Sequence, residues 1–247
     1  MVRKLKSLLT KFYIKFLEHT YEDRLKYLFQ KNHSDTLIVV FSGFTDKPMY
    51  NYVRTLQNIK ADKIFMLDDF GHKGSYYWYE NGDNKPMMLV KSLIYNMLNK
   101  KKYKRLITLG SSKGGTCAIY YGLMFGATDI YSGACQYRIG TYLNTADRVL
   151  VFKAMMGVQA AEKEQAILDA EMPQLITKYK GLPSRVHLLY SKEEHTYEDD
   201  IKYLIKDLDD SNINHDDKVE TFTDHGEVGK YFSPWIKNEL EKLINNG

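Results

Sequence analysis

The sequence predicts an α/β protein with a mostly parallel, doubly wound sheet and helices on both faces of that sheet. Short apolar runs without polar alternation recur along the chain, and such runs suit strands that are buried on both faces. Longer stretches with helical spacing separate these runs, and strands that alternate with helices imply βαβ units. The candidate site residues follow predicted strands, which is where open α/β sheets bind ligands.

Six apolar runs are the predicted strands, beginning with a β-branched run that ends in glycine: residues 36–43, 63–68, 105–110, 129–133, 185–190 and 218–222. The helical stretches are residues 49–59, 86–99, 114–126, 144–179, 198–208 and 234–245. The third strand candidate runs directly into a helix rich in small residues. The polar residues 209–217 are expected to form a loop before the last strand.

Composition predicts one globular domain, residues 1–247, because no linker interrupts the chain and 44% of the residues are hydrophobic. The net charge of +4 is too balanced to indicate a nucleic-acid-binding protein. Two cysteines, Cys117 and Cys135, cannot form a disulfide framework. We expect both to be buried as small apolar residues, which fits a cytoplasmic protein.

Residues 1–31 combine basic and apolar side chains in a pattern that predicts a basic amphipathic helix. This stretch holds eight lysines and arginines against three acidic residues. Such a helix would either pack on the domain with a solvated basic face or lie on an anionic membrane surface, so membrane association is the alternative. Lysines interrupt the apolar run, so neither a signal peptide nor a transmembrane helix is expected.

The segment Gly110-Ser111-Ser112-Lys113-Gly114 fits the pattern G-x-S-x-G with Ser112 at its centre. A nucleophile on a sharp strand-to-helix turn needs small residues two positions before it and two after it. Ser111 as the centre would instead place Leu109 at one of these small positions. The P-loop and dinucleotide-binding patterns both fail here. Ser112 is therefore the predicted nucleophile.

This turn, followed by Gly115 and by the partner residues described next, resembles the α/β-hydrolase superfamily from about Thr36 to the C-terminal helix. Within the superfamily, the chain resembles bacterial proteins of accessory secretion and capsular-polysaccharide biosynthesis. The resemblance implies an α/β-hydrolase sheet with a small helical cap, which falls at residues 144–180. It also implies a Ser–acid–His triad that requires no cofactor and no metal.

The superfamily order implies His225 as the base, because it directly follows the last predicted strand and has a glycine beside it. The acid is expected after strand 185–190. With Ser191 as the small residue of the family pattern, the acid falls at Glu194. Glu193, one position away, stays open as an alternative, and Asp199 is a more distant one. A solvated helix that begins with these acidic residues is the structural alternative.

Two backbone N–H groups, those of Lys113 and Phe44, are the expected oxyanion-hole donors. Gly43 would allow the close approach to the substrate, and Ser42 stands where the family has a histidine. Asp68 and the adjacent Asp69 also follow a strand. With no other metal-ligand spacing in the chain, they are interpreted as a turn cap.

A polar loop over residues 74–83 contains four consecutive aromatic residues, 76–79. Aromatic faces at the mouth of a site stack on sugar rings, so Tyr76 and Trp78 are candidate substrate contacts, together with His72. The alternative is that these aromatic side chains pack the loop against the helices.

These residues predict a serine esterase that acts on a small-molecule or glycan ester, with deacetylation of a bacterial surface glycan as the preferred reaction. Acyl transfer to a sugar hydroxyl needs the same triad and stays open. A non-catalytic binding or scaffold protein that keeps the hydrolase fold is the second alternative, because Ser42 and Glu194 depart from the commoner residues.

Overall fold

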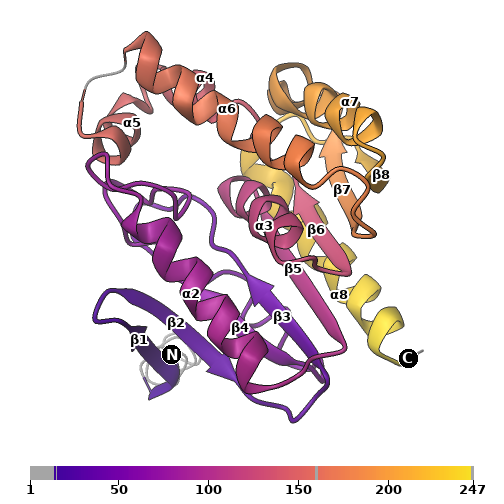
Figure 1. The fold of residues 1–247 in the computed structure, drawn as a ribbon. Helices are drawn as coiled ribbons and strands as arrows, with labels where there is room; N and C mark the ends of the chain where they lie inside the picture. The colour runs from indigo at the N-terminus through magenta and orange to yellow at the C-terminus, as the bar shows by residue number, and fades with distance from the viewer. Residues whose placement is uncertain (1–13, 15, 159–160, 246–247) are drawn as a thin grey trace, which may run out of the picture.

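The computed structural model describes residues 14, 16–158 and 161–245, and its centre is one eight-stranded sheet (Figure 1). The strand order is β1-β2-β4-β3-β5-β6-β7-β8. Strand β2 is antiparallel to both of its neighbours, whereas β4, β3 and β5 to β8 are parallel. The strands are β1 (Glu18–Tyr21), β2 (Leu25–Gln30), β3 (Thr36–Val40), β4 (Asp62–Met66), β5 (Arg105–Ser111), β6 (Asp129–Gly133), β7 (Arg185–Ser191) and β8 (Asn214–Glu220).

Helices cover both faces of the sheet, as predicted. Helices α2, α3, α6 and α7 contribute to the core on one face, and α8 packs with turns of the segment 50–61 on the other. In Figure 1, α2 and α3 lie in front of the sheet and α8 lies behind it. The helices are α2 (Lys85–Lys100), α3 (Lys113–Met124), α4 (Ile139–Leu143), α5 (Val149–Met156), α6 (Glu162–Lys178), α7 (Lys202–Asp210) and α8 (Val228–Asn245).

The central strand β3 shows why the sequence has continuous apolar runs. All five of its residues are buried. Leu37 and Val39 pack in the core with α2 and α3, whereas Ile38 and Val40 pack in the core with α8. Successive side chains of a strand point to opposite faces, so a strand covered on both sides is apolar at every position.

The predicted helix over residues 1–31 is wrong for its second half, which forms β1 and β2. Residues 1–13 lie outside the described part of the chain. In β2, Leu25 packs in the core of one face and Leu28 in that of the other, because their odd spacing places them on opposite sides of a strand. Hydrogen bonding to the open edge of β4 outweighs the local helical pattern. Within the described residues, no helix has the length and apolarity needed to cross a membrane.

Two further segments differ from the sequence prediction. Residues 53–58 form successive turns, not the predicted helix, after a bend at Tyr52, which has a left-handed φ of 61°. The prediction of a loop over residues 209–217 is wrong from Asn214 onward. Strand β8 begins at that residue and pairs with the whole length of β7. Strand β8 lies at the edge of the sheet and is largely exposed, so its polar sequence gives no apolar signal.

The segment predicted as a cap contains α5 and α6. It lies at the end of the molecule toward which the parallel strands point (Figure 1). A π-helical turn, Tyr197–Ile201, precedes α7, and a 3₁₀ turn, His225–Glu227, precedes α8. The role of residues 144–180 as a cap stays a prediction.

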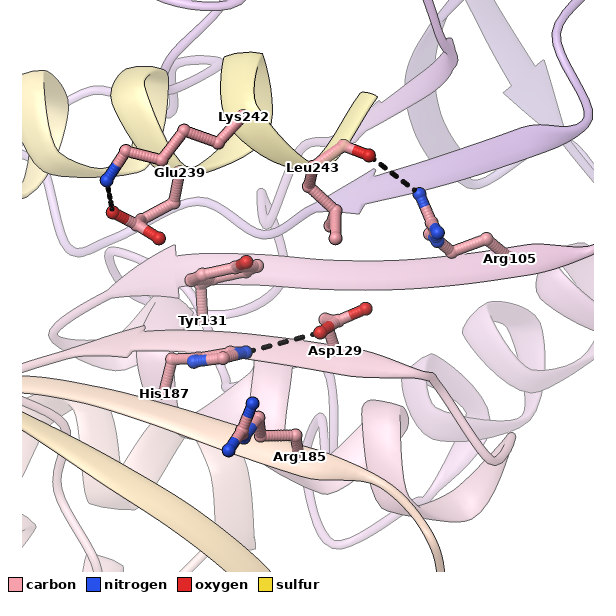
Figure 2. A pocket seen from close by; sticks show the side chains of 8 residues that line it. All are labelled: Arg105, Asp129, Tyr131, Arg185, His187, Glu239, Lys242 and Leu243. Carbon is pink, nitrogen blue, oxygen red and sulfur yellow. Dashed lines mark hydrogen bonds and ion pairs between the residues drawn. The ribbon is translucent and has the colours of Figure 1, made fainter. Parts of the chain in front are cut away.

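At the opposite end of the sheet, His187 of β7 lies beside Tyr131 and Asp129 of β6 (Figure 2), and it also contacts Asp216 of β8. Its ring stacks on Tyr131 of β6 with centroids 4.3 Å apart. Its Nε2 lies 3.3 Å from Asp129 Oδ1, and its Nδ1 lies 2.8 Å from Asp216 Oδ2 of β8. Burial lowers the pKa of His187, but the hydrogen bonds with the two aspartates outweigh it, so the pKa is raised above 6.5.

This network predicts a pH-dependent contribution of His187 to stability. Because the folded-state pKa is raised, the stabilisation is complete below 6.5 and is lost as the pH rises through the folded-state value. The difference in unfolding free energy between wild type and His187→Gln, measured by urea denaturation, should therefore be larger at about pH 6 than at about pH 8.5. A difference that stays constant across this range would contradict the assignment.

Candidate active site

Ser112 lies in the sharp turn between β5 and α3, with φ 53° and ψ −130°. A residue other than glycine in such a conformation costs of order 1–3 kcal/mol and needs a surrounding structure that enforces it. The Ser112 N–H donates to Gly133 O of β6 at 2.7 Å, and Gly115 N–H donates to Ser112 O at 2.8 Å. The neighbouring strand and the helix thus hold the turn from both sides.

The two glycines of the G-x-S-x-G pattern are required by direct backbone contact. A Cβ on Gly110 would lie 2.3 Å from Gly114 O, and a Cβ on Gly114 would lie 2.5 Å from Phe41 O. No atom of a side chain fits at either distance. The small residues that the pattern predicts are therefore set by the close approach of β5, α3 and the end of β3.

A chain of hydrogen bonds leads from Ser112 to a buried carboxylate. Ser112 Oγ lies 2.8 Å from His225 Nε2, and His225 Nδ1 lies 3.1 Å from Glu194 Oε1. These side chains come from the ends of β5, β8 and β7. Glu194 is 1% exposed, whereas the alternative acids Glu193 and Asp199 are both exposed. Of these acids, Glu194 is the one hydrogen-bonded to His225.

Glu194 has a second hydrogen-bonding neighbour, because its Oε2 accepts from Thr196 Oγ1. Its Oε1 also lies 2.6 Å from Nδ1 of the half-exposed His195. Burial raises the pKa of Glu194, but the hydrogen bonds from His225 and Thr196 outweigh it and lower the pKa overall. The ionised carboxylate only accepts hydrogen bonds, so His225 Nδ1 carries the proton. The Nε2 lone pair is then free to accept the Ser112 proton.

The expected oxyanion donors lie beside this turn. Lys113 is the first residue of α3, and the first N–H groups of a helix have no intrahelical partner. Phe44 follows Gly43, whose N–H donates to Asn51 Oδ1 at 3.1 Å. A Cβ on Gly43 would lie 3.5 Å from Ser111 O, so the loop after β3 contacts the end of β5. The donor roles of Lys113 and Phe44 stay predictions.

The Lys113 side chain forms a buried ion pair that the sequence did not suggest. Its Nζ lies 2.5 Å from Asp68 Oδ2, and neither side chain is exposed. Asp68 Oδ2 also accepts the N–H groups of Ser75 at 2.9 Å and Tyr77 at 3.2 Å. Lys113 Nζ lies 5.4 Å from the ring centroid of Phe44. The pair therefore connects the nucleophile turn, the loop after β4 and the loop after β3.

The predicted aromatic substrate contacts are buried. Tyr76 and Trp78 are both 0% exposed, and Trp78 packs against Tyr120 with centroids 4.8 Å apart. Their ring faces pack in the core under α3. The prediction that they stack on substrate is therefore wrong, and the alternative, that they pack the loop against the helices, holds. His72 is exposed in a turn, and within the described residues no hydrogen bond or ion pair joins it to Ser112, His225 or Glu194.

Gln136 is a site residue that the sequence reasoning missed. Its Nε2 donates to Ser112 Oγ at 3.3 Å, and its Oε1 accepts from the Tyr76 hydroxyl at 3.2 Å. Gln136 follows β6, so the rule that sites lie at the carboxyl ends of strands points to this loop. Asp69, the neighbour of Asp68, pairs with Arg24 and Lys26. Within the described residues, no group of three metal-ligating side chains comes together.

Known structures resemble this chain over most of its length, although no protein-family profile and no curated protein sequence matches it. The capsule O-acetyltransferase of Neisseria meningitidis serogroup A superposes with a TM-score of 0.74 at 18% identity, covering 91% of this chain and 93% of that one. S-formylglutathione hydrolase from Staphylococcus aureus gives a TM-score of 0.60 at 13% identity, covering 89% and 92%. The chain has an α/β-hydrolase fold.

The Glycosylation Associate Protein (Gap123) complex from Streptococcus agalactiae also matches, with a TM-score of 0.73 at 16% identity. This match covers 91% of the present chain but 46% of the other. Capsule and glycosylation proteins are thus among the structural neighbours, as the sequence resemblance implied. At these identities the likeness shows the fold alone.

Because the Lys113–Asp68 pair is buried, removing one of its two charges should strongly reduce the stability of the protein. Lys113→Met leaves the Asp68 charge buried without its partner, and breaking a buried pair in this way costs about 3–5 kcal/mol of unfolding free energy. Urea denaturation checks this. The double variant Lys113→Met/Asp68→Leu removes both charges and should recover part of the loss. A single variant as stable as wild type would contradict the structural importance of the pair.

Proposed function

We propose that the protein is a serine esterase in which Ser112 is the nucleophile, His225 the general base and Glu194 the orienting acid. The observation that carries this proposal is the hydrogen-bond chain from Ser112 Oγ through His225 to Glu194 Oε1. The strained turn at Ser112 is further support, because a nucleophile elbow has this backbone conformation.

The reaction follows from the direction of these hydrogen bonds. Ser112 Oγ attacks the ester carbonyl while His225 Nε2 accepts its proton, and Glu194 stabilises the imidazolium that results. The N–H groups of Lys113 and Phe44 donate hydrogen bonds to the carbonyl oxygen as it becomes negatively charged. His225 then protonates the leaving alcohol. A water molecule, activated by the same histidine, releases the acyl group from Ser112.

The proposed substrate class is an acetyl ester on a bacterial surface glycan. It is supported by the structural likeness to the capsule O-acetyltransferase, whose name describes the transfer of acetyl groups to a capsule. The same likeness favours a second candidate, transfer of an acetyl group to a sugar hydroxyl. The two reactions share the acyl-enzyme on Ser112 and differ in the acceptor that attacks it.

The triad proposal is tested by labelling with a fluorophosphonate probe and by hydrolysis of p-nitrophenyl acetate. Ser112→Ala should abolish labelling, and His225→Ala and Glu194→Gln should lower kcat by about 10³- to 10⁴-fold. Glu193→Gln is the matched control, because this exposed neighbour does not contact His225 and its loss should leave kcat unchanged. Failure of the wild type to label would overturn the esterase and favour the scaffold alternative.

Esterase and transferase are separated by a product balance. With p-nitrophenyl acetate as donor, an esterase releases one acetate for each p-nitrophenol, whether or not an oligosaccharide is added. A transferase places part of the acetyl groups on the oligosaccharide, so acetate falls short of p-nitrophenol. We expect the two products to remain equal, and mass spectrometry of the oligosaccharide checks for transfer directly.

A further inference from the structure

Gln136 is fixed on the nucleophile by hydrogen bonds from three directions. The side chain is 0% exposed. Thr116 Oγ1 of α3 donates to Gln136 O at 2.7 Å and accepts Gln136 N–H at 3.0 Å, so the backbone is tied to the helix that follows Ser112. The carboxamide then spans the distance from the Tyr76 hydroxyl to Ser112 Oγ.

The Tyr76 hydroxyl and Ser112 Oγ together fix which way the carboxamide points. Burial raises the pKa of Tyr76 well above its ordinary value, so the hydroxyl is neutral and has a proton to donate. That proton goes to Gln136 Oε1 at 3.2 Å. Ser112 Oγ gives its one proton to His225 Nε2, so towards Gln136 it can only accept, and the carboxamide nitrogen Nε2 faces Ser112.

The loop that carries Gln136 is held by elements outside the turn. Asp200, in the π-helical turn before α7, accepts the N–H groups of Tyr137 at 2.8 Å and Arg138 at 2.9 Å. Ala134 N–H donates to Leu189 O of β7 at 2.7 Å. Position and orientation of the amide donor are thus set before any substrate binds.

We infer that Gln136 is a further catalytic residue of the proposed esterase, which donates a hydrogen bond to Ser112 Oγ, and that Tyr76 is a positioning residue that acts through it. The inference rests on the proposed function. Ser112 Oγ donates its proton to His225 Nε2 and accepts from Gln136 Nε2, so these two partners define one orientation of the hydroxyl.

The donor becomes more important as the reaction proceeds. When the Oγ–H bond breaks and the proton moves to His225 Nε2, negative charge develops on Oγ until the bond to the carbonyl carbon is complete. A hydrogen bond to a charged acceptor is roughly twice as strong as one to a neutral acceptor. In the acyl-enzyme, Oγ is an ester oxygen, and it gains charge again when it leaves during deacylation. Gln136 therefore stabilises the charge in both halves of the reaction.

Kinetics of three single variants at Gln136 and Tyr76 test the inference. Gln136→Met keeps the approximate volume and removes the donor, and it should lower kcat for p-nitrophenyl acetate by about 10- to 100-fold with little change in KM. Gln136→Glu replaces the donor with an acceptor and should lose at least as much. Tyr76→Phe should lower kcat by about three- to tenfold, since the amide remains but is no longer oriented.

The matched control is Tyr121→Phe. Tyr121 is equally buried and its hydroxyl donates to Tyr77 O at 2.8 Å, away from Ser112. It should lose about as much unfolding free energy as Tyr76→Phe while keeping kcat. The double variant Tyr76→Phe/Gln136→Met should be no slower than Gln136→Met alone, because Tyr76 acts through the amide.

The outcomes separate this inference from the proposed function. A wild type that labels at Ser112, with Gln136→Met folded and retaining its kcat, overturns the role of Gln136 and leaves the esterase intact. A loss of kcat in Tyr121→Phe equal to that in Tyr76→Phe also overturns the positioning role, since it would report packing alone. A wild type that neither labels nor hydrolyses the ester overturns both proposals.

Discussion

The left-handed backbone of Ser112 is the constraint on which the arrangement of the site depends. Its cost, of order 1–3 kcal/mol, is offset by the strand and helix on either side, which hydrogen-bond the turn to Gly133 and Gly115. The glycine contacts that permit the turn also press α3 against the end of β3, which carries the loop with Gly43 and Phe44. One local conformation therefore fixes the direction of the Ser112 side chain and its distance from both expected oxyanion donors.

The parallel sheet brings residues distant in sequence to this turn. Ser112 and His225 are 113 residues apart, and they meet because β5, β7 and β8 all end at the same edge. The loops that carry Glu194 and His225 follow the neighbouring strands β7 and β8, whose pairing runs as far as Ser191 and Glu220. A one-residue change in this register would move one loop relative to the other. The register of an exposed edge strand is thus part of the geometry of the site.

The sequence predicted the parts of the fold whose residues are buried on both faces or compressed into a turn, such as β3 and the G-x-S-x-G segment. It did not predict β2 or the start of β8, because these strands are defined by pairing with a sheet edge and their own residues are mixed or polar. Glu194 and His225 were inferred from the family order. The contacts of Lys113 with Asp68, and of Gln136 with Ser112, were missed because no spacing along the chain indicates which distant side chains meet.

The aromatic side chains of the loop 74–83 were predicted to contact substrate, but they are part of the core, and the chemistry of tyrosine explains why. A tyrosine contributes a large apolar ring and a polar hydroxyl, and burial requires that the hydroxyl find a partner. Tyr77 satisfies this by bonding Ser42 and Met66 O, and Tyr76 by bonding Gln136. The rings fill the core under α3 while the hydroxyls connect the loops after β3, β4 and β6. Phenylalanine would fill the same volume without these connections, so the 20 tyrosines against 11 phenylalanines are consistent with a core that also orients polar groups beside the site.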